Sequence, residues 1–165
     1  MLEAATHAAR EAGEIQLAAR GQRMDEVEKG RGASFATELD YRCENAILSI
    51  LRDRFPDHAF IAEESGTSGI EDAEYTWAID PLDGTISYVS GQPYFAVSIG
   101  LLRAREPVLG VINLPALGKM YWGARGTGAF RDGQRIHVSG EASSIAPCSG
   151  SISRISVVGH LRSGD

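Results

Sequence analysis

The sequence predicts an α+β fold in which two amphipathic helices are followed by a mostly antiparallel sheet. Apolar residues recur at helical spacing in two segments of the first 55 residues. After that point, short apolar runs alternate with turn-like segments that contain glycine, proline or aspartate. The chain has 165 residues, 43% of them hydrophobic and 23% charged, a composition typical of globular proteins. We therefore expect a single domain over residues 1–165, with helices and strands packed in layers.

The first helix is predicted over residues 2–20. Apolar residues on one face of this segment are Leu2, Ala5, Ala8, Ala12, Ile15 and Ala19. Gly21 follows them and is typical of a helix end. The next residues, 21–34, are polar and contain several glycines, so a loop is expected there.

The second helix is expected to begin near Thr37 or Glu38 and to end before Pro56. Its apolar stripe comprises Leu39, Cys43, Ala46, Ile47, Ile50 and Leu51. A cysteine on such a stripe is more often a small buried hydrophobe than a reactive thiol. Cys43 is therefore predicted to be part of the core.

Successive strands are predicted in the middle of the chain. The apolar runs that indicate them cover residues 58–62, 76–79, 96–102, 108–114, 120–124 and 128–131. Asp132-Gly133 predicts a further hairpin, because glycine adopts the positive φ that tight turns need. Residues 65–74 are polar and are predicted to form a loop, and the apolar run 155–158 is a candidate for one more strand.

Composition excludes several classes of protein. No run of about 18 apolar residues exists that could span a bilayer, and three glutamates in the first sixteen residues argue against a secretory or transit peptide. The net charge of −6 argues against nucleic acid and membrane surfaces as partners. Two cysteines, Cys43 and Cys148, cannot form a disulfide framework and lack the spacing of a zinc site. We expect a cytoplasmic protein.

Three carboxylates stand at the ends of predicted strands. Glu63 follows one apolar run, and Asp80 and Asp83 follow the next. Carboxylates in such places are costly unless they are exposed, paired or bound to a metal. Pro81 fixes its own φ, so the chain turns sharply, and both aspartates and the carbonyl group of Leu82 can converge on one point. Ligation by oxygen atoms alone suits a hard cation such as Mg²⁺.

Gly84 and Thr85 follow the acidic pair directly. If a short helix starts there, over about residues 86–90, their N–H groups form an anion site facing the metal. Taken alone, a Glu-Glu pair is usually a solvated face and a D-G-T run is usually a turn or a helix cap. A phosphatase motif with an aspartate nucleophile, D-x-D-G-T, is excluded, because Pro81 stands where its first aspartate is required.

Longer runs around these residues resemble a known family. The run A-E-E-S-G lies at 62–66, followed by W-A-I-D-P-L-D-G-T at 77–85. Further similar runs are F-A-T-E-L-D at 35–40, G-V-I-N-L-P at 110–115, K-M-Y-W-G-A at 119–124 and G-T-G-A-F-R-D-G-Q at 126–134. Together they resemble the inositol monophosphatase family of Mg²⁺-dependent, lithium-sensitive sugar and inositol phosphatases, and they match its N-terminal portion.

The resemblance implies an αβαβα layered fold and a defined set of site residues. It implies metal ligation by Glu63, Asp80, the carbonyl group of Leu82 and Asp83. Glu63 and Asp83, with Gly84 and Thr85, are the implied substrate-binding residues.

A water-activating pair, Thr85 with Asp40, is also implied by the resemblance. A threonine hydroxyl hydrogen-bonded to a carboxylate can hold and polarise a water molecule, and Glu63 can accept its proton. We therefore expect the Thr85 hydroxyl group to meet Asp40. The implied reaction is hydrolysis of a small phosphate monoester, an inositol phosphate or a related sugar or nucleotide phosphate. Mg²⁺ is the expected cofactor, Mn²⁺ a possible substitute and Li⁺ an inhibitor.

One family signature, W-D-x-A-x-G, supplies an aspartate to a second metal ion and does not occur within the 165 residues. This difference predicts weak binding of Mg²⁺ or Mn²⁺ and poor hydrolysis by the chain on its own. It also predicts that the C-terminal layers of the fold are missing and that an apolar sheet face is covered in a homodimer. The second hypothesis is thus a weak or inactive family member that acts as a metal-binding or subunit-interaction module.

Overall fold

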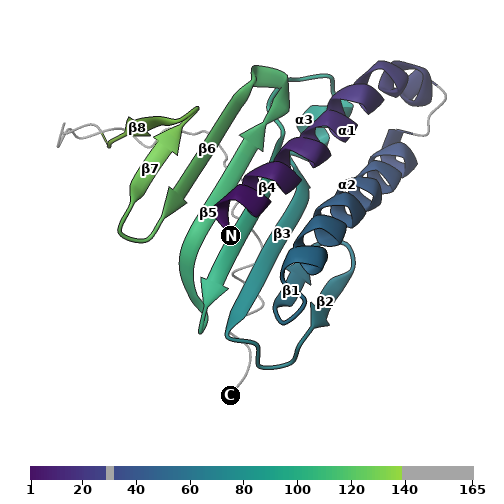
Figure 1. The fold of residues 1–165 in the computed structure, drawn as a ribbon. Helices are drawn as coiled ribbons and strands as arrows, with labels where there is room; N and C mark the ends of the chain where they lie inside the picture. Colours follow the sequence, from purple (N-terminus) through teal and green to yellow (C-terminus); the bar gives the residue numbers. More distant parts are fainter. Residues whose placement is uncertain (29–31, 139–165) are drawn as a thin grey trace, which may run out of the picture.

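The structure of the chain is a computed structural model that describes residues 1–28 and 32–138. Within this part of the chain, two long helices cover one face of an eight-stranded sheet (Figure 1). The strand order is β2-β1-β3-β4-β5-β6-β7-β8, and β1 and β3 are parallel while the other neighbouring strands are antiparallel. The predicted α+β class with a mostly antiparallel sheet is therefore confirmed.

Both helices are longer than predicted. Helix α1 comprises Leu2–Glu28 and helix α2 comprises Gly32–Arg54. The loop expected at 21–34 is therefore wrong over most of its length, and Gly21 does not end α1. A single glycine costs a helix only about 1 kcal/mol relative to alanine. The helix-favouring residues that follow it, chiefly Gln, Arg, Met and Glu, offset that cost.

The strands largely match the predicted runs. They are β1 (Ala59–Ala62), β2 (Gly66–Gly69), β3 (Tyr75–Asp83), β4 (Ala96–Arg103), β5 (Glu106–Leu114), β6 (Lys119–Ala124), β7 (Gly128–Arg131) and β8 (Gln134–Ile136). The short helices are α3 (Thr85–Val89) and η1 (Pro115–Leu117). The hairpin predicted at Asp132-Gly133 joins β7 to β8, and both residues have positive φ.

Strand β2 was not predicted. Its residues, Gly-Thr-Ser-Gly, are polar and mostly exposed, so the pattern lacks the apolar alternation by which strands are recognised. The segment is a strand because it pairs antiparallel with β1, from Ala59 opposite Gly69 to Ala62 opposite Gly66. The predicted loop at 65–74 is therefore wrong in its first half. The candidate strand at 155–158 and Cys148 lie outside the described residues.

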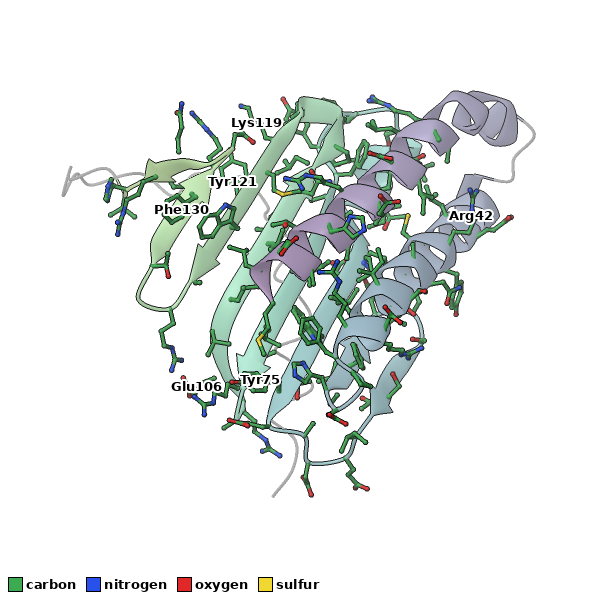
Figure 2. The ribbon with its side chains drawn as sticks, viewed as in Figure 1. Arg42, Tyr75, Glu106, Lys119, Tyr121 and Phe130 are labelled. Atoms are coloured by element: carbon green, nitrogen blue, oxygen red, sulfur yellow. The ribbon has the colours of Figure 1, made fainter. Side chains whose placement is uncertain are left out.

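The hydrophobic core lies between the helix pair and the sheet. Its large, fully buried side chains are Phe60, Trp77, Ile79, Ile99 and Leu101 from the strands and Leu39, Ile47 and Leu51 from α2. Cys43 is also fully buried, as predicted, and burial raises the pKa of its thiol to about 12. Arg42, its neighbour in α2, is exposed and projects away from the sheet (Figure 2). The helical periodicity thus separates a buried face from a charged face.

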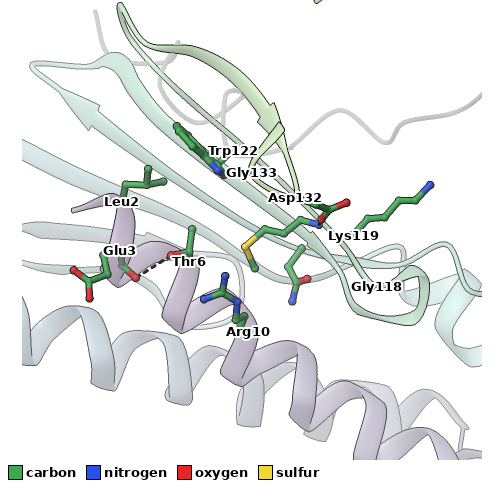
Figure 3. Close-up of a pocket in the computed structure, with 11 residues that line it drawn as sticks. Leu2, Glu3, Thr6, Arg10, Gly118, Lys119, Trp122, Asp132 and Gly133 are labelled. Atoms are coloured by element: carbon green, nitrogen blue, oxygen red, sulfur yellow. Dashed lines mark hydrogen bonds between the residues drawn. The ribbon is translucent and has the colours of Figure 1, made fainter. Parts of the chain in front are cut away.

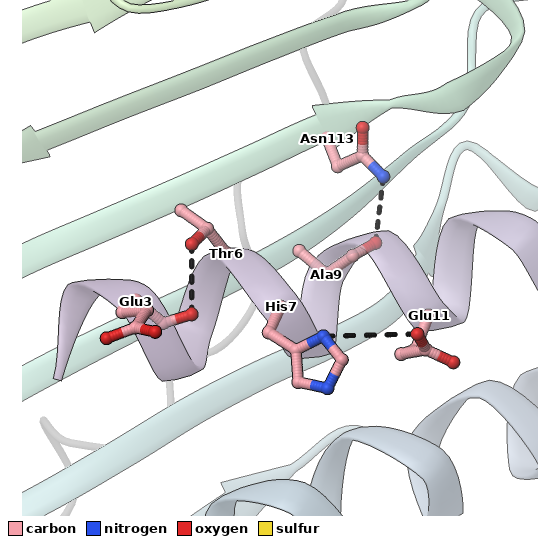
Figure 4. A network of polar contacts seen from close by, with 6 residues as sticks. All are labelled: Glu3, Thr6, His7, Ala9, Glu11 and Asn113. Atoms are coloured by element: carbon pink, nitrogen blue, oxygen red, sulfur yellow. Dashed lines mark hydrogen bonds and ion pairs between the residues drawn. The ribbon is translucent and has the colours of Figure 1, made fainter.

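Helix α1 lies close to the sheet because its buried face is built from small residues. These are Ala4, Ala5, Ala8, Ala9 and Ala12. The amide Nδ2 of Asn113, on β5, donates a hydrogen bond of 2.8 Å to the carbonyl oxygen of Ala9 (Figure 4). A Cβ atom on Gly13 would lie only 2.4 Å from that Nδ2 atom. The glycine is therefore required by the close approach of α1 to β5.

Candidate active site

The parallel pair of β1 and β3 brings Glu63 beside Asp80. Ala62, the last residue of β1, is paired with Ile79 of β3. Glu63 follows Ala62 in the chain, and Asp80 follows Ile79. The backbone N–H of Glu63 donates a 3.1 Å hydrogen bond to the carbonyl oxygen of Ile79. Parallel strands present their carboxyl ends at the same edge of a sheet, where open α/β sheets bind ligands.

A β-bulge places Asp80 and Asp83 on the same side of β3. Asp80 pairs with Ser98 and Asp83 pairs with Ala96, so three steps along β3 match two steps along β4. In a regular strand, residues three apart point to opposite faces. The extra residue of the bulge cancels this difference. Pro81 lies in the bulge, one of the few places within a sheet that tolerate a proline.

Burial, followed by the crowding of acidic groups, raises the pKa values of carboxyl groups at this edge. Burial, the negative charge of Glu63, a hydrogen bond between the Glu63 and Asp80 carboxyl groups, and the charge of Asp83 raise the pKa of Asp80 to about 8. A hydrogen bond from the Leu82 N–H to Asp80 Oδ1 (3.2 Å) opposes the shift. A hydrogen bond between two carboxyl groups requires a proton on one of them, which agrees in direction with the raised pKa of Asp80.

The predicted convergence of three carboxylates is not complete. Glu63 and Asp80 are in contact, and the charge of Asp83 reaches Asp80. Across residues 1–28 and 32–138, however, no three Asp, Glu, His or Cys side chains are grouped so as to hold a metal ion. The donor set itself, carboxylate and carbonyl oxygens with excess negative charge, fits a hard divalent cation. Burial is the largest cause of the raised pKa of Asp80, and a cation would offset the further contribution from the charges of Glu63 and Asp83.

Helix α3 begins at Thr85, in agreement with the short helix expected after the acidic pair. Gly84 precedes it with a φ of 87°, and a Cβ atom there would lie 2.8 Å from the carbonyl oxygen of Tyr94. The hydroxyl group of Thr85 donates a 3.1 Å hydrogen bond to the carbonyl oxygen of Leu82. The expected hydrogen bond from Thr85 to Asp40 is therefore not found, because the carbonyl group three residues earlier takes the single hydroxyl proton.

Asp40 lies on the buried face of α2 and is directed toward acidic groups. Burial, then the charges of Glu64, Glu63 and Glu44, raise its pKa to about 7. Its Oδ1 atom is buried and has no hydrogen-bond partner. The structure thus brings Asp40 within electrostatic reach of Glu63, while its predicted contact with Thr85 is absent.

Two further residues bind the backbone next to Glu63 and Asp80, and the sequence analysis did not predict either of them. Glu44 of α2 accepts hydrogen bonds from the backbone N–H groups of Glu64 (2.8 Å) and Ser65 (3.1 Å). Gln16 of α1 donates from Nε2 to the carbonyl oxygen of Pro81 in the bulge (2.8 Å). A signal existed in each case, because both are polar residues directly beside an apolar stripe position of their helix.

The described residues also line an open cavity of about 690 Å³ between the start of α1 and strand β6 (Figure 3). Its lining carries both signs of charge, from Glu3 and Asp132 and from Arg10 and Lys119. None of the predicted site residues lines it. The cavity is therefore separate from the acidic edge of the sheet, and its mixed charge does not favour a phosphate.

Comparison with known proteins identifies the family of the chain. The model of the inositol monophosphatase family matches residues 1–164. Inositol monophosphatase 2 from Homo sapiens is 43% identical over 142 residues, which are 84% of this chain and 49% of that protein. A protein from Aquifex aeolicus described as fructose-1,6-bisphosphatase/inositol-1-monophosphatase is 42% identical over 116 residues, 70% of this chain and 44% of its own length.

The fold is similar to that of solved structures with the same description. An inositol monophosphatase from Anabaena superposes with a TM-score of 0.75 at 40% sequence identity, over 86% of this chain and 50% of that chain. The chain thus spans about half the length of the curated relatives it matches. A search of the described helices finds none with the length and apolar character that crossing a membrane requires.

Proposed function

The chain belongs to the inositol monophosphatase family, and from this we propose that it carries out the Mg²⁺-dependent hydrolysis of a small phosphate monoester. The names of the relatives suggest an inositol phosphate or a sugar phosphate as substrate, and a nucleotide phosphate is included in the proposed substrate class. The observation that carries the proposal is the contact between Glu63 and Asp80, with Asp83 on the same side of β3. Such crowding of carboxylates at a strand edge is typical of a cation site.

Four oxygen donors are proposed to hold the cation: the carboxylates of Glu63, Asp80 and Asp83 and the carbonyl group of Leu82. Mg²⁺ prefers such donors and takes the rest of its shell from water and substrate phosphate. When bound, it supplies Lewis-acid stabilisation of the charge on the phosphoryl oxygens.

The chain's own residues are proposed to handle the attacking water. Glu63 is exposed at the end of β1, where it can accept a proton from a water molecule. The hydroxyl group of Thr85 donates a hydrogen bond to the carbonyl oxygen of Leu82, and its oxygen retains lone pairs that can accept a hydrogen bond from the same water. Asp40, with a pKa of about 7, can exchange a proton at neutral pH.

The phosphate group is proposed to lie against Gly84 and Thr85. The first N–H groups of a helix have no partner within it, and here they follow Asp83 directly. Glu63 and Asp83 would contact the substrate through the cation. We further propose that Mn²⁺ can replace Mg²⁺, that Li⁺ inhibits, and that the protein acts in the cytoplasm as a homodimer.

The test is a phosphate-release assay on inositol 1-phosphate, fructose 1,6-bisphosphate and an adenosine bisphosphate, with Mg²⁺ titrated from zero. We expect slow release, in keeping with the poor hydrolysis predicted for this chain, that requires Mg²⁺ and that Glu63→Gln lowers by about 10²–10⁴, the range for loss of a general base. Glu71→Gln, the same change at an exposed residue before β3, serves as the control. Release that is independent of Mg²⁺, or that survives Glu63→Gln, would contradict the proposal.

A second candidate function is a metal-binding or subunit-interaction module with little or no turnover. The observation that favours it is that no three acidic, histidine or cysteine side chains of the described residues form a ready metal site. Binding of Mg²⁺ without phosphate release from any of the three substrates would favour this function over hydrolysis.

A further inference from the structure

Glu44 is a buried carboxylate with no cationic partner among the described residues. Its side chain is 1% exposed on the inner face of α2, among the apolar residues Cys43, Ile47 and Leu48. The ion pairs within the described part of the chain do not include it. Its charge also acts on other acidic groups, because it raises the pKa values of Asp40 and Glu64. A carboxylate in this place is costly unless its hydrogen bonds are strong.

Both carboxylate oxygens of Glu44 accept hydrogen bonds from two consecutive backbone N–H groups. Oε2 accepts from the N–H of Glu64 at 2.8 Å, and Oε1 accepts from the N–H of Ser65 at 3.1 Å. Hydrogen bonds to an ionised carboxylate are roughly twice as strong as neutral ones. The two N–H groups belong to the residues immediately after Glu63. The turn from β1 to β2 is therefore fixed to α2 at this point.

Glu63 is consequently held on both sides. Its own N–H donates to the carbonyl oxygen of Ile79, which sets its position along β3. The following two peptide groups are held by Glu44. With its backbone fixed before and after, Glu63 reaches Asp80 without a further loss of backbone entropy, and only its side chain must be ordered by the contact.

We propose that Glu44 is a positioning residue, which holds Glu63 against Asp80 so that the two carboxylates bind a divalent cation together. This inference rests on the proposed function and adds a residue to it that does not touch the cation or the substrate. Partners that orient metal-ligating groups are typically worth 10- to 100-fold in metal affinity.

The test compares Mn²⁺ binding, measured by electron paramagnetic resonance, for the full chain and three variants. Glu44→Gln keeps the size of the side chain but presents an NH₂ group to one of the two backbone donors. Glu64→Gln removes one negative charge from the same cluster and leaves both backbone hydrogen bonds intact. The charge of Glu64 acts on Asp40 more strongly than that of Glu44 does. Cys43→Ala disturbs packing at the neighbouring buried position.

We expect Glu44→Gln to weaken Mn²⁺ binding at least tenfold, while Glu64→Gln changes it less than threefold and Cys43→Ala lowers only the thermal stability. If Glu44→Gln and Glu64→Gln lose the same amount of Mn²⁺ affinity, then Glu44 acts only through its negative charge, and the inference is overturned. Unchanged binding in Glu44→Gln would also overturn it.

Failure of the proposed function is a separate outcome. If the unmodified chain binds no Mn²⁺, the proposed cation site is wrong, and amide hydrogen exchange then decides the role of Glu44. At least tenfold faster exchange at Glu63, Glu64 and Ser65 in Glu44→Gln, but not in Cys43→Ala, would support the positioning of Glu63 by Glu44. Unchanged exchange at these three amides would overturn it.

Discussion

At the scale of single residues, Asp80 is the most strongly perturbed group of the acidic edge. Its grouping with Glu63 and Asp83 could be predicted, because all three follow apolar runs in the sequence. The contact that lets Asp80 share a proton with Glu63 could not, because it depends on the side-by-side pairing of β1 and β3. The partner of the Thr85 hydroxyl was predicted wrongly, since a local carbonyl group competes with the distant Asp40.

The raised pKa values predict how stability depends on pH. Asp80 and Asp40 have pKa values of about 8 and 7 in the folded chain and ordinary values, near 4, when unfolded. Between pH 4 and 8 the folded state therefore binds more protons than the unfolded state. Stability must then fall as pH rises through this window, by up to about 1.4 kcal/mol per pH unit for each proton.

Urea unfolding at pH 5, 6, 7 and 8 measures this dependence, with Asp80→Asn as the reference variant. His58 has a lowered pKa, which opposes the trend below its ordinary value of 6.5, but its effect is the same in both proteins. We expect the urea midpoint to fall more steeply with pH in the unmodified chain than in Asp80→Asn. If the urea midpoint falls equally steeply with pH in both proteins, Asp80 is ionised over the whole range from pH 5 to 8.

Thr85→Ala is expected to lower phosphate release at least tenfold while changing Mn²⁺ affinity less than about threefold. The hydroxyl group is proposed to act on the attacking water, and its loss frees the Leu82 carbonyl oxygen rather than removing it. Thr85→Ser, which retains the hydroxyl group, should preserve most of the activity. Turnover in Thr85→Ala equal to that of the unmodified chain would exclude this role.

At the scale of elements, sequence periodicity located the helices and nearly all strands but not their limits. The apolar stripe of α1 ends near residue 20, whereas the helix continues to Glu28 without such a stripe. Strand β2 lacks an apolar pattern and exists through its pairing with β1. The closeness of α1 to β5 was also not evident, although the alanine-rich face with Gly13 is the composition that permits it.

Gly13→Ala tests that close packing. An alanine usually stabilises a helix by about 1 kcal/mol relative to glycine. Here its Cβ atom would lie 2.4 Å from Asn113 Nδ2 and 3.1 Å from Pro115 Cβ, so the Asn113 hydrogen bond to Ala9 must break or α1 must move. Overpacking of this kind typically costs 1–3 kcal/mol. We therefore expect a net loss of stability and a melting temperature lower by several degrees.

The control for Gly13→Ala is Gly110→Ala on β5, where an added Cβ atom meets nothing within 4 Å. We expect that variant to be at least as stable as the unmodified chain. Thermal unfolding followed by circular dichroism measures both. A higher melting temperature for Gly13→Ala would show that α1 does not lie against Asn113.

At the scale of the whole molecule, the two-helix layer both covers the sheet and holds the acidic edge. Gln16 of α1 fixes the bulge through Pro81, and Glu44 of α2 fixes the turn after Glu63. The contact of Gln16 joins residues that are 65 positions apart in the chain, and the contacts of Glu44 join residues that are 20 and 21 positions apart. Periodicity and motif spacing do not contain such pairings, so the site residues could be predicted from the sequence and their supports could not.

The most direct test of the proposed cation site at Glu63, Asp80 and Asp83 is the number of protons released when Mg²⁺ binds at pH 7. Isothermal titration calorimetry in two buffers of different ionisation enthalpy measures it. Because burial and the neighbouring carboxylates raise the pKa of Asp80 to about 8 and a cation binds carboxylates in the ionised form, we predict release of about one proton per Mg²⁺. Asp80→Asn should lower that release, leaving only the share that comes from Asp40, and should weaken binding. Binding without proton release, or no binding to the unmodified chain, would contradict the proposed site.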